Sequence, residues 1–215
     1  MDIYYLGLSS FLLKGKKASV VTDPYDSKMV GLKYPKTEAN IVTVSHDHGD
    51  HNAVTNVSGN SIVFSGPGEY ESMGVSFIGL PSFHDDKKGK LRGKNIIFLI
   101  EMDGLRIGHF GDIGHKLSEK LLGEIGDLDV AMLPVGGEYT VDTDTASEMA
   151  RSIGARVTIP MHFQMPGLNK KVFGKLTSVD DFLTKSGFQV EKMRKLTIKP
   201  EFITEDQKVV LLEKR

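Results

Sequence analysis

The segment Ser45-His46-Asp47-His48-Gly49-Asp50-His51 places three histidines and an aspartate in the pattern His-x-His-x-Asp-His. It follows the apolar stretch Ile41-Val42-Thr43-Val44, whose composition predicts a buried strand. Imidazole nitrogens and carboxylate oxygens are the usual ligands of zinc and other first-row divalent ions. Alternate residues of an extended chain can converge on one ion, so the first two histidines predict one metal site. The Asp-His pair that follows predicts a second site nearby, while a polar loop with solvated histidines is the simpler alternative.

Three further candidate ligands lie just beyond the C-terminal ends of predicted strands: His84, Asp112 and His162. Open α/β sheets place their sites in the loops at these ends. Taken singly, a histidine after a strand is more often a hydrogen-bonded surface residue, and an aspartate beside glycine is more often a turn residue. Their joint placement with the motif favours one shared metal cluster.

The order of the expected elements predicts mixed α/β layers with helices on the outside. Segments rich in Val, Ile and Phe predict strands over 2–6, 10–14, 18–22, 41–44, 61–64, 74–80 and 95–102. In the second half, strands over 104–110, 129–133, 156–160 and 208–213 alternate with helices near 116–124, 143–152 and 178–186. Thr143 or Asp144 is the expected cap of the second helix and Ser178 of the third, which Gly187 ends. The length fits a single domain over 1–215.

Composition excludes several classes of function. The 27 basic and 28 acidic residues nearly cancel, which argues against a general nucleic-acid-binding or membrane-surface protein. The absence of cysteine excludes thiolate zinc sites, iron–sulfur clusters and a cysteine nucleophile. The longest apolar run, Ile96–Ile100, is too short to span a bilayer, and the opening residues lack the pattern of a signal peptide. We therefore expect a cytoplasmic protein that acts on a small molecule, without a nucleic-acid or membrane partner.

The motif and the later ligands together resemble the metallo-β-lactamase superfamily. The resemblance is carried by His46–His51, His84, Gly108–Asp112 and Pro160–Phe163, which come in the family's order and span most of the chain. Two flanking pieces, 5–11 and 133–140, resemble one branch, the compact metal-dependent hydrolases grouped with ascorbate-6-phosphate lactonase.

The resemblance implies a fold and a ligand set. The fold is a four-layer αβ/βα sandwich, with the site at one edge of the paired sheets. The implied ligands are His46, His48 and His84 on the first ion, Asp50, His51 and His162 on the second, and Asp112 bridging both. His109 and His115 match no ligand position. A ligand set of histidines and carboxylates suits zinc, with manganese and iron left open.

Such a site implies a hydrolase in which two metal ions activate water as a hydroxide nucleophile at neutral pH. The expected substrate bond is an ester or a lactone, with a phosphodiester as the alternative. A third reading is a metal-binding scaffold that has lost turnover. We expect Asp112 to hold the spacing of the two ions and Asp50 to guide the proton of the attacking water.

Several residues near the expected site are open to two interpretations. Asp23 is either a partner that orients a ligand imidazole or part of an Asp-Pro turn. Glu138 and Tyr139 either contact substrate or shape a turn. Two basic clusters follow metal ligands and would favour an anionic substrate, unless they are merely solvated loops. These clusters are Lys87, Lys88, Lys90, Arg92 and Lys94 after His84, and Lys170, Lys171 and Lys175 after His162.

Overall fold

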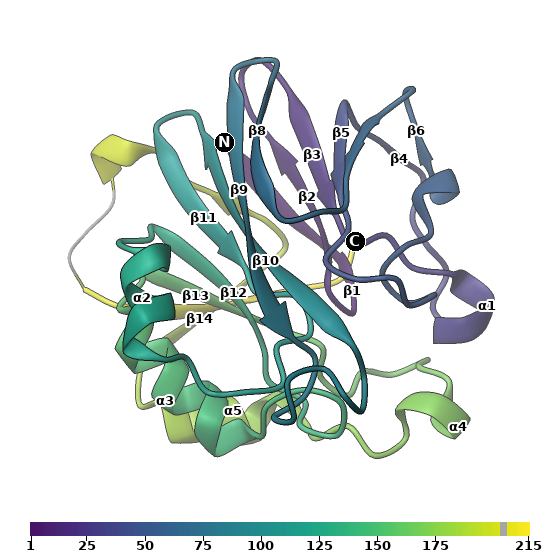
Figure 1. Cartoon of the computed structure of the whole chain (residues 1–215), viewed down its shortest axis with the longest axis vertical. Helices are drawn as coiled ribbons and strands as arrows, with labels where there is room; N and C mark the ends of the chain where they lie inside the picture. Colours follow the sequence, from purple (N-terminus) through teal and green to yellow (C-terminus); the bar gives the residue numbers. More distant parts are fainter. Residues whose placement is uncertain (203–205) are drawn as a thin grey trace.

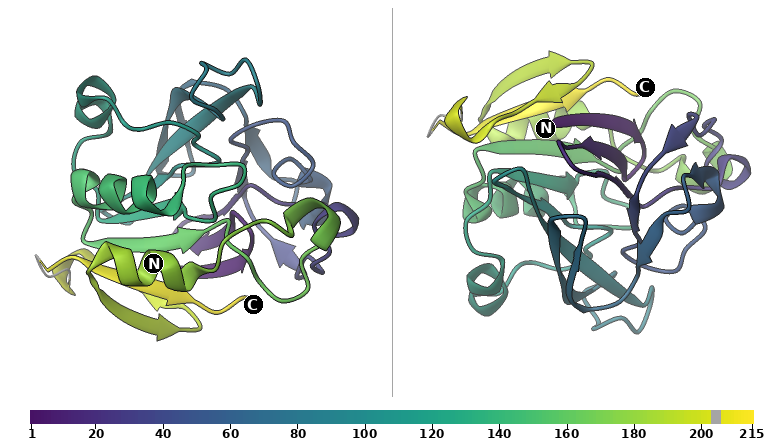
Figure 2. Two further views of the ribbon diagram at one scale, coloured as in Figure 1. Left: turned by 90° about the horizontal axis from the view of Figure 1, so that it is seen from below. Right: turned by 90° about the horizontal axis from the view of Figure 1, so that it is seen from above.

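The computed structural model describes residues 1–202 and 206–215. Within these residues two β-sheets pack face to face, and helices and loops cover their outer faces (Figure 1; Figure 2). The expected four-layer αβ/βα arrangement is thereby confirmed. No helix in the described parts of the chain is long and apolar enough to cross a bilayer.

The first sheet is built mainly from the N-terminal part of the chain. Its strand order is β15-β1-β2-β3-β5-β7. The bounds are β15 (Leu196–Thr197), β1 (Asp2–Gly7), β2 (Ser10–Lys14), β3 (Ser19–Thr22), β5 (Ile41–Thr43) and β7 (Ile62–Phe64). Strands β3, β5 and β7 run parallel to one another. A short ribbon of β4 (Thr37–Glu38) and β6 (Val57–Ser58) lies outside this sheet.

The second sheet takes the rest of the chain in the order β14-β16-β13-β12-β11-β10-β9-β8. Strands β11, β12, β13 and β16 are parallel neighbours, whereas β10 runs antiparallel to both β9 and β11. Strands β9 and β11 therefore point the same way. The bounds are β8 (Gly68–Ser72), β9 (Val75–Phe83), β10 (Lys94–Met102), β11 (Leu105–His109), β12 (Val130–Pro134), β13 (Val157–Met161), β14 (Gln189–Met193) and β16 (Lys208–Leu212).

The main core lies between the two sheets. Ile3, Phe11 and Val20 of the first sheet belong to one buried cluster with Phe77 and Phe98 of the second. Successive strand residues point to opposite faces, so a strand covered on both sides needs apolar residues at consecutive positions. This is why β2, β3, β5 and β10 appear in the sequence as continuous apolar runs rather than alternating ones.

The outer faces of the sheets have different covers. Helices α2 (Glu119–Ile125), α3 (Thr143–Ile153) and α5 (Val179–Ser186) lie on the second sheet (Figure 1). The first sheet is covered by loops and by the single turns α1 (Ser27–Val30) and α4 (Lys170–Phe173). Two 3-10 turns, η1 (Val54–Asn56) and η2 (Pro200–Phe202), complete the described elements.

One predicted helix start and one predicted cap are wrong, although the predicted start of the second helix near residue 143 is confirmed. Helix α2 begins at residue 119 rather than 116, because the Ser118 hydroxyl accepts the backbone N–H of Leu121. Helix α3 is capped by Asp142, not by Thr143 or Asp144: its carboxylate accepts the N–H of Thr145 at 2.8 Å. The Ser178 cap and the terminal glycine at Gly187, whose φ is 72°, are confirmed.

Candidate metal centre

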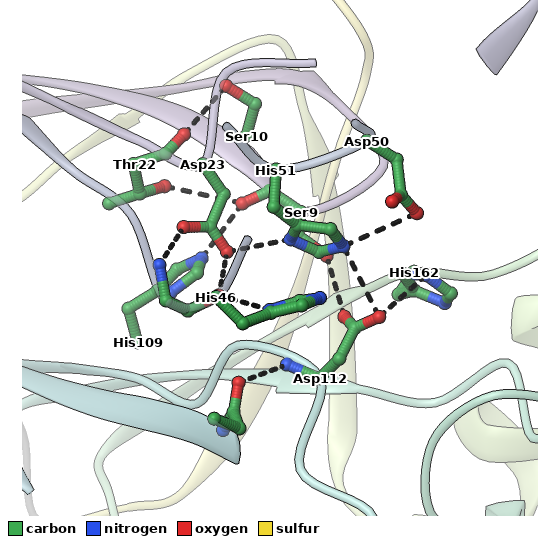
Figure 3. Close-up of polar contacts among 12 residues, drawn as sticks. Ser9, Ser10, Thr22, Asp23, His46, Asp50, His51, His109, Asp112 and His162 are labelled. Atoms are coloured by element: carbon green, nitrogen blue, oxygen red, sulfur yellow. Dashed lines mark hydrogen bonds and ion pairs between the residues drawn. The ribbon is translucent and has the colours of Figure 1, made fainter. Parts of the chain in front are cut away.

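The seven predicted ligands meet at one edge of the paired sheets. The motif follows the end of β5, and His84, Asp112 and His162 follow the ends of β9, β11 and β13. Since β9, β11 and β13 run in the same direction, their carboxyl ends share one edge of the second sheet. Figure 3 shows His46 and His51, from the segment after β5, close to Asp112 and His162. Side chains 116 residues apart in sequence are brought together in this way.

The acidic part of the cluster centres on Asp112. Its Oδ2 lies 3.2 Å from Nε2 of His51, 3.2 Å from Nε2 of His162 and 3.3 Å from Nε2 of His84. The Asp50 carboxylate lies 3.4 Å from Nε2 of His51. Ligand atoms around a tetrahedral ion with bonds near 2.0–2.1 Å stand about 3.4 Å apart, so these separations suit metal ligation. The group Asp50, His51, Asp112 and His162 can converge on one ion.

The second group that can converge on one ion is His46, His48 and His84. The ring centroids of His46 lie 4.7 Å from those of both His48 and His84. His46 and His84 are buried, whereas His48 is exposed to solvent. Because Asp112 contacts His84 of this group as well as His51 and His162 of the other, its position fits a carboxylate shared by two sites.

Unpartnered nitrogens test whether this cluster is built for metal. Nε2 of His46, His51 and His162 are buried and have no hydrogen-bond partner among the described residues. Buried polar atoms are nearly always hydrogen-bonded, and leaving one unpaired costs roughly 1–3 kcal/mol. The unpaired nitrogen of His46 belongs to one candidate group and those of His51 and His162 to the other, and all three are accounted for if the two groups coordinate cations. The donor set therefore fits divalent metal ions.

Asp23 fixes the orientation of two ligand imidazoles. Its carboxylate accepts Nδ1–H of His51 at 2.8 Å, and it also accepts the backbone N–H and the hydroxyl of Ser45. With its proton given to Asp23, the Ser45 oxygen accepts Nδ1–H of His46 at 2.9 Å. In its neutral form, each of these two rings then presents a lone pair at Nε2, toward the site (Figure 3). Asp23 is thus a positioning residue rather than only a turn residue.

Charge and burial set the protonation of the cluster. Burial, with the neighbouring His51, lowers the pKa of His46 to about 3, so this ring is neutral and able to ligate. Burial opposes charge on His51 too, but the carboxylates of Asp112 and Asp50 outweigh it and raise the pKa of His51 well above its usual value. The protein thus favours a positive charge at His51, which a proton or a metal ion can supply.

Strained backbone and close packing hold the remaining ligands. His162 has a left-handed φ of 54°, and its N–H donates to Leu8 O at 2.9 Å. Such a conformation is uncommon outside glycine and persists where surrounding contacts impose it. Asp112 is held by Asn95, whose Oδ1 accepts the Asp112 N–H at 3.0 Å.

A cavity of about 350 Å³ lies over the cluster. Its ligand-bearing wall includes His48, Asp50, His84 and Asp112. The rest of the wall is Met29, Leu91, Arg92, Tyr139, Val172 and Phe173. A mainly apolar pocket of about 560 Å³, which His46 also lines, adjoins this cavity and shares His48 and Arg92 with it. A small organic molecule can thus reach the candidate metal site from solvent.

Glu138 and Tyr139, whose roles the sequence left undecided, and the two remaining histidines occupy different positions around the site. Tyr139 lies in the cavity wall, whereas the Glu138 carboxylate faces Lys175, 3.6 Å away. His109 and His115 belong to neither ligand group, as expected from the sequence. His109 donates Nε2–H to Ser9 O, and His115 accepts the N–H of Phe83.

Two positioning residues were missed by sequence reasoning. Ser45 lies inside the quoted motif, but its link between Asp23 and His46 has no sequence signal. Asn95 is a polar residue at the start of the apolar run of β10, and it is only 1% exposed. A polar residue at the edge of so apolar a segment is the one signal that marks it, since buried amides need partners.

Comparison with known proteins places this geometry in context. Residues 2–162 match the family model described as a beta-lactamase superfamily domain. A UPF0173 metal-dependent hydrolase from Methanoregula boonei is 33% identical over 188 residues, covering 76% of this chain and 82% of the relative. A crystal structure from Thermotoga maritima, named as a candidate Zn-dependent hydrolase of the metallo-beta-lactamase superfamily, is 35% identical with a TM-score of 0.82. That match covers 98% of this chain and 97% of the other.

More distant structures share the fold alone. An isothiocyanate hydrolase from Delia radicum gut bacteria is 14% identical, with a TM-score of 0.68 over 100% of this chain and 97% of that one. At such identity the architecture is common, but the loops that shape the substrate cavity are free to differ.

Proposed function

This chain belongs to the metallo-β-lactamase superfamily and is a metal-dependent hydrolase, and from that premise we propose that it uses two metal ions to hydrolyse an ester or a lactone. The observation that carries the proposal is the contact of one carboxylate oxygen with both ligand groups. Asp112 Oδ2 lies 3.2–3.3 Å from Nε2 of His51, His84 and His162. One mononuclear site would leave the second group of histidines without a role.

The protein's own residues supply position and orientation. Zinc ions, when bound, would supply a hydroxide at neutral pH and would polarise the carbonyl oxygen of the ester or lactone. Asp23 and Ser45 keep the lone pairs of His51 and His46 facing the ions. Burial would raise the pKa of Asp50, but His51 outweighs it and lowers this pKa to about 2. The ionised Asp50 carboxylate at the cavity wall can therefore accept a hydrogen bond from the attacking water and orient it.

Cavity size and composition support a small organic substrate. The space over the cluster is about 350 Å³, near the lower end of the range for small-molecule sites. Apolar side chains at its mouth, Met29 and Leu91, are 37% and 69% exposed. They suit the hydrocarbon part of a substrate, and the neighbouring basic residues suit an anionic group.

The test is a panel of lactones, carboxylic esters, thioesters and phosphodiesters, assayed with added zinc or manganese. We expect turnover on lactones or esters that disappears in His46→Ala protein prepared in parallel, which controls for contaminating hydrolases. Turnover on phosphodiesters alone would replace the ester by the phosphodiesterase alternative. If elemental analysis finds bound metal and no class is hydrolysed, the protein is a metal-binding scaffold.

A further inference from the structure

The guanidinium of Arg92 borders the cavity over the metal cluster without a carboxylate partner. Two acidic residues close to Arg92 in the structure pair with lysines instead: Asp86 of the same loop with Lys87 at 3.1 Å, and Glu138, whose backbone contacts Arg92, with Lys175 at 3.6 Å. Across residues 1–202 and 206–215, Arg92 takes part in no ion pair. The cavity wall thus carries a guanidinium that is not within ion-pair distance of any carboxylate of the described residues.

The backbone around Arg92 is tied to that of His84, a candidate metal ligand, by hydrogen bonds within one loop. The loop that leaves the sheet at His84 returns at Gly93, whose carbonyl accepts the His84 N–H at 3.0 Å. Inside the loop, the Asp85 carboxylate accepts four backbone N–H groups, which include those of Leu91 and Arg92 at 2.9 and 2.8 Å. The loop is therefore a hydrogen-bonded structure and not a free segment.

The side chain of Arg92 is held by two residues of the loop after β12, Glu138 and Tyr139. Its guanidinium carbon lies 5.6 Å from the ring centroid of Tyr139, and Nη2 donates to Glu138 O at 3.1 Å. The Tyr139 hydroxyl donates to Val172 O, and its ring meets His162 edge-on, with centroids 6.4 Å apart. Arg92 thus rests on a ring that itself contacts a candidate metal ligand.

We propose that Arg92, held against Tyr139, binds an oxyanion group of the substrate, a carboxylate or a phosphate, next to the bond that is cleaved. This proposal rests on the proposed function, because it places the substrate in the cavity over the metal ions. The planar fork of a guanidinium binds both kinds of oxyanion through two parallel hydrogen bonds. The bond to Glu138 O occupies only one of its five donors.

The basic residues after His162 do not share this position. Lys170, Lys171 and Lys175 line a separate cavity of about 610 Å³, which touches the substrate cavity only through Tyr139 and Val172. Lys87 is 61% exposed and paired with Asp86. Of the two basic clusters, Arg92 is the residue in the wall of the cavity over the metal cluster, whereas Lys94 lines the adjoining pocket beside His46 and His48.

Binding of product analogues to the metal-loaded protein tests this role without turnover. Calorimetric titrations would compare succinate, 3-phosphonopropionate and butyrate on wild type, Arg92→Gln and Arg92→Lys. One carboxylate of each compound can occupy the metal site, and only the first two carry a second anion for Arg92. We expect Arg92→Gln to weaken at least one dianion fivefold or more and to leave butyrate within twofold. Arg92→Lys, which keeps the charge and loses the fork, should lie between.

A matched control and a metal measurement make the result decisive. Arg194→Gln removes the same charge from a surface ion pair with Glu213 and should change no affinity. Elemental analysis of each variant should find unchanged metal. The dianion that Arg92→Gln weakens more identifies the group as carboxylate or phosphate. The proposal is overturned if neither dianion weakens fivefold, if butyrate weakens equally, or if wild type binds the dianions no better than butyrate. If the protein hydrolyses no ester or lactone, the proposed function is wrong, but the titrations still show whether Arg92 binds the second anion, because they do not require turnover.

Discussion

At the scale of single residues, two aspartates divide the work of holding the metal cluster. Asp112 reaches into it directly, with one carboxylate oxygen near three imidazole nitrogens. Asp23 touches none of the cavity but fixes the rings of His51 and, through Ser45, His46. Asp112 is 1% exposed and Asp23 is 0% exposed, so solvent water cannot take over the contacts of either carboxylate without rearrangement of the surrounding side chains.

Replacing Asp112 by alanine should reduce occupancy of both metal sites. The carboxylate oxygen that contacts both ligand groups is lost, so we expect elemental analysis to find well below the two ions per chain expected of the wild type. Asp127→Ala, at an exposed position of the same residue type, is the control and should keep full metal content. An Asp112→Ala protein that keeps both ions and full activity would remove the bridging assignment.

The hydrogen-bond relay from Asp23 predicts that two variants will differ. Asp23→Asn replaces one acceptor oxygen by an NH2 donor, so the side chain can no longer accept from both the Ser45 backbone and the His51 ring. It should weaken both metal sites by about 10–100-fold, as is usual for such partners. Ser45→Ala removes only the link to His46 and should weaken mainly the site of His46, His48 and His84. Zinc titration against a competing chelator would measure the affinity of each of the two metal sites in both variants. Equal losses at both sites in Ser45→Ala would contradict the relay.

At the scale of elements, the site depends on close approach between loops that follow neighbouring strands. Strands β12 and β13 are parallel, and the loops after them carry Gly136 and His162. A Cβ placed on Gly136 would lie 2.0 Å from the carbonyl oxygen of His162. Glycine at this position lets the loop after β12 pack on the backbone of a metal ligand.

Gly136→Ala should therefore displace His162 and lower both stability and metal content. The clash is with backbone rather than with a flexible side chain, so we expect destabilisation of about 1–3 kcal/mol, typical of overpacking. Gly123→Ala in helix α2 is the matched control, because a Cβ there meets nothing within 4 Å. Alanine favours a helix, so this control should gain up to about 1 kcal/mol. Denaturant unfolding and metal analysis would measure both; a Gly136→Ala protein that behaves like Gly123→Ala would refute the argument.

The elements that carry the ligands were predictable, because strands buried on both faces leave long apolar runs in the sequence. Polar edge strands were not: β8 (Gly68–Ser72) and β14 (Gln189–Met193) have half-exposed faces and no apolar run. Short turns such as α1 and α4 also escaped, since four residues give no helical period. The two expected ligand sets are among the three groups of side chains that could hold an ion; the third is Asp23, His46 and His51, in which Asp23 accepts a hydrogen bond from Nδ1 of His51. The assignment of ligands to ions stays a prediction.

Long-range contacts explain what sequence could not supply at the site. The bond from Ser45 to Asp23 joins residues 22 positions apart, and that from Asp112 to Asn95 joins residues 17 positions apart. The left-handed φ of His162 is imposed by packing and has no local signature. Single-residue roles that arise from tertiary contact in this way require the structure.

At the scale of the whole molecule, the candidate metal cluster lies at one edge of the paired sheets and takes its side chains from segments that follow strands of both. The motif 46–51 follows β5 of the first sheet, whereas His84, Asp112 and His162 follow strands of the second. Ions bound here would cross-link the sheets at one edge, beyond the apolar core between them. Ligands that bind only the folded state stabilise it by mass action, by about 2.7 kcal/mol per site when free ligand is 100 times its Kd.

Removing the metals with a chelator should therefore lower the unfolding midpoint and loosen one edge of the molecule. Hydrogen exchange should speed up in 45–51, 84–93 and 162–168, while β10 and β12 in the core keep their protection.

The drop in the unfolding midpoint on metal removal should be smaller at pH 6 than at pH 8. Asp112 and Asp50 raise the pKa of His51 well above its usual value despite burial. A raised pKa stabilises the metal-free protein below the unfolded value near 6.5, and this contribution is lost as pH rises through the folded value. A proton thus replaces part of the metal's charge at pH 6. Equal midpoints with and without metal at pH 8, with metal loss verified by elemental analysis, would show that the ions do not join the sheets.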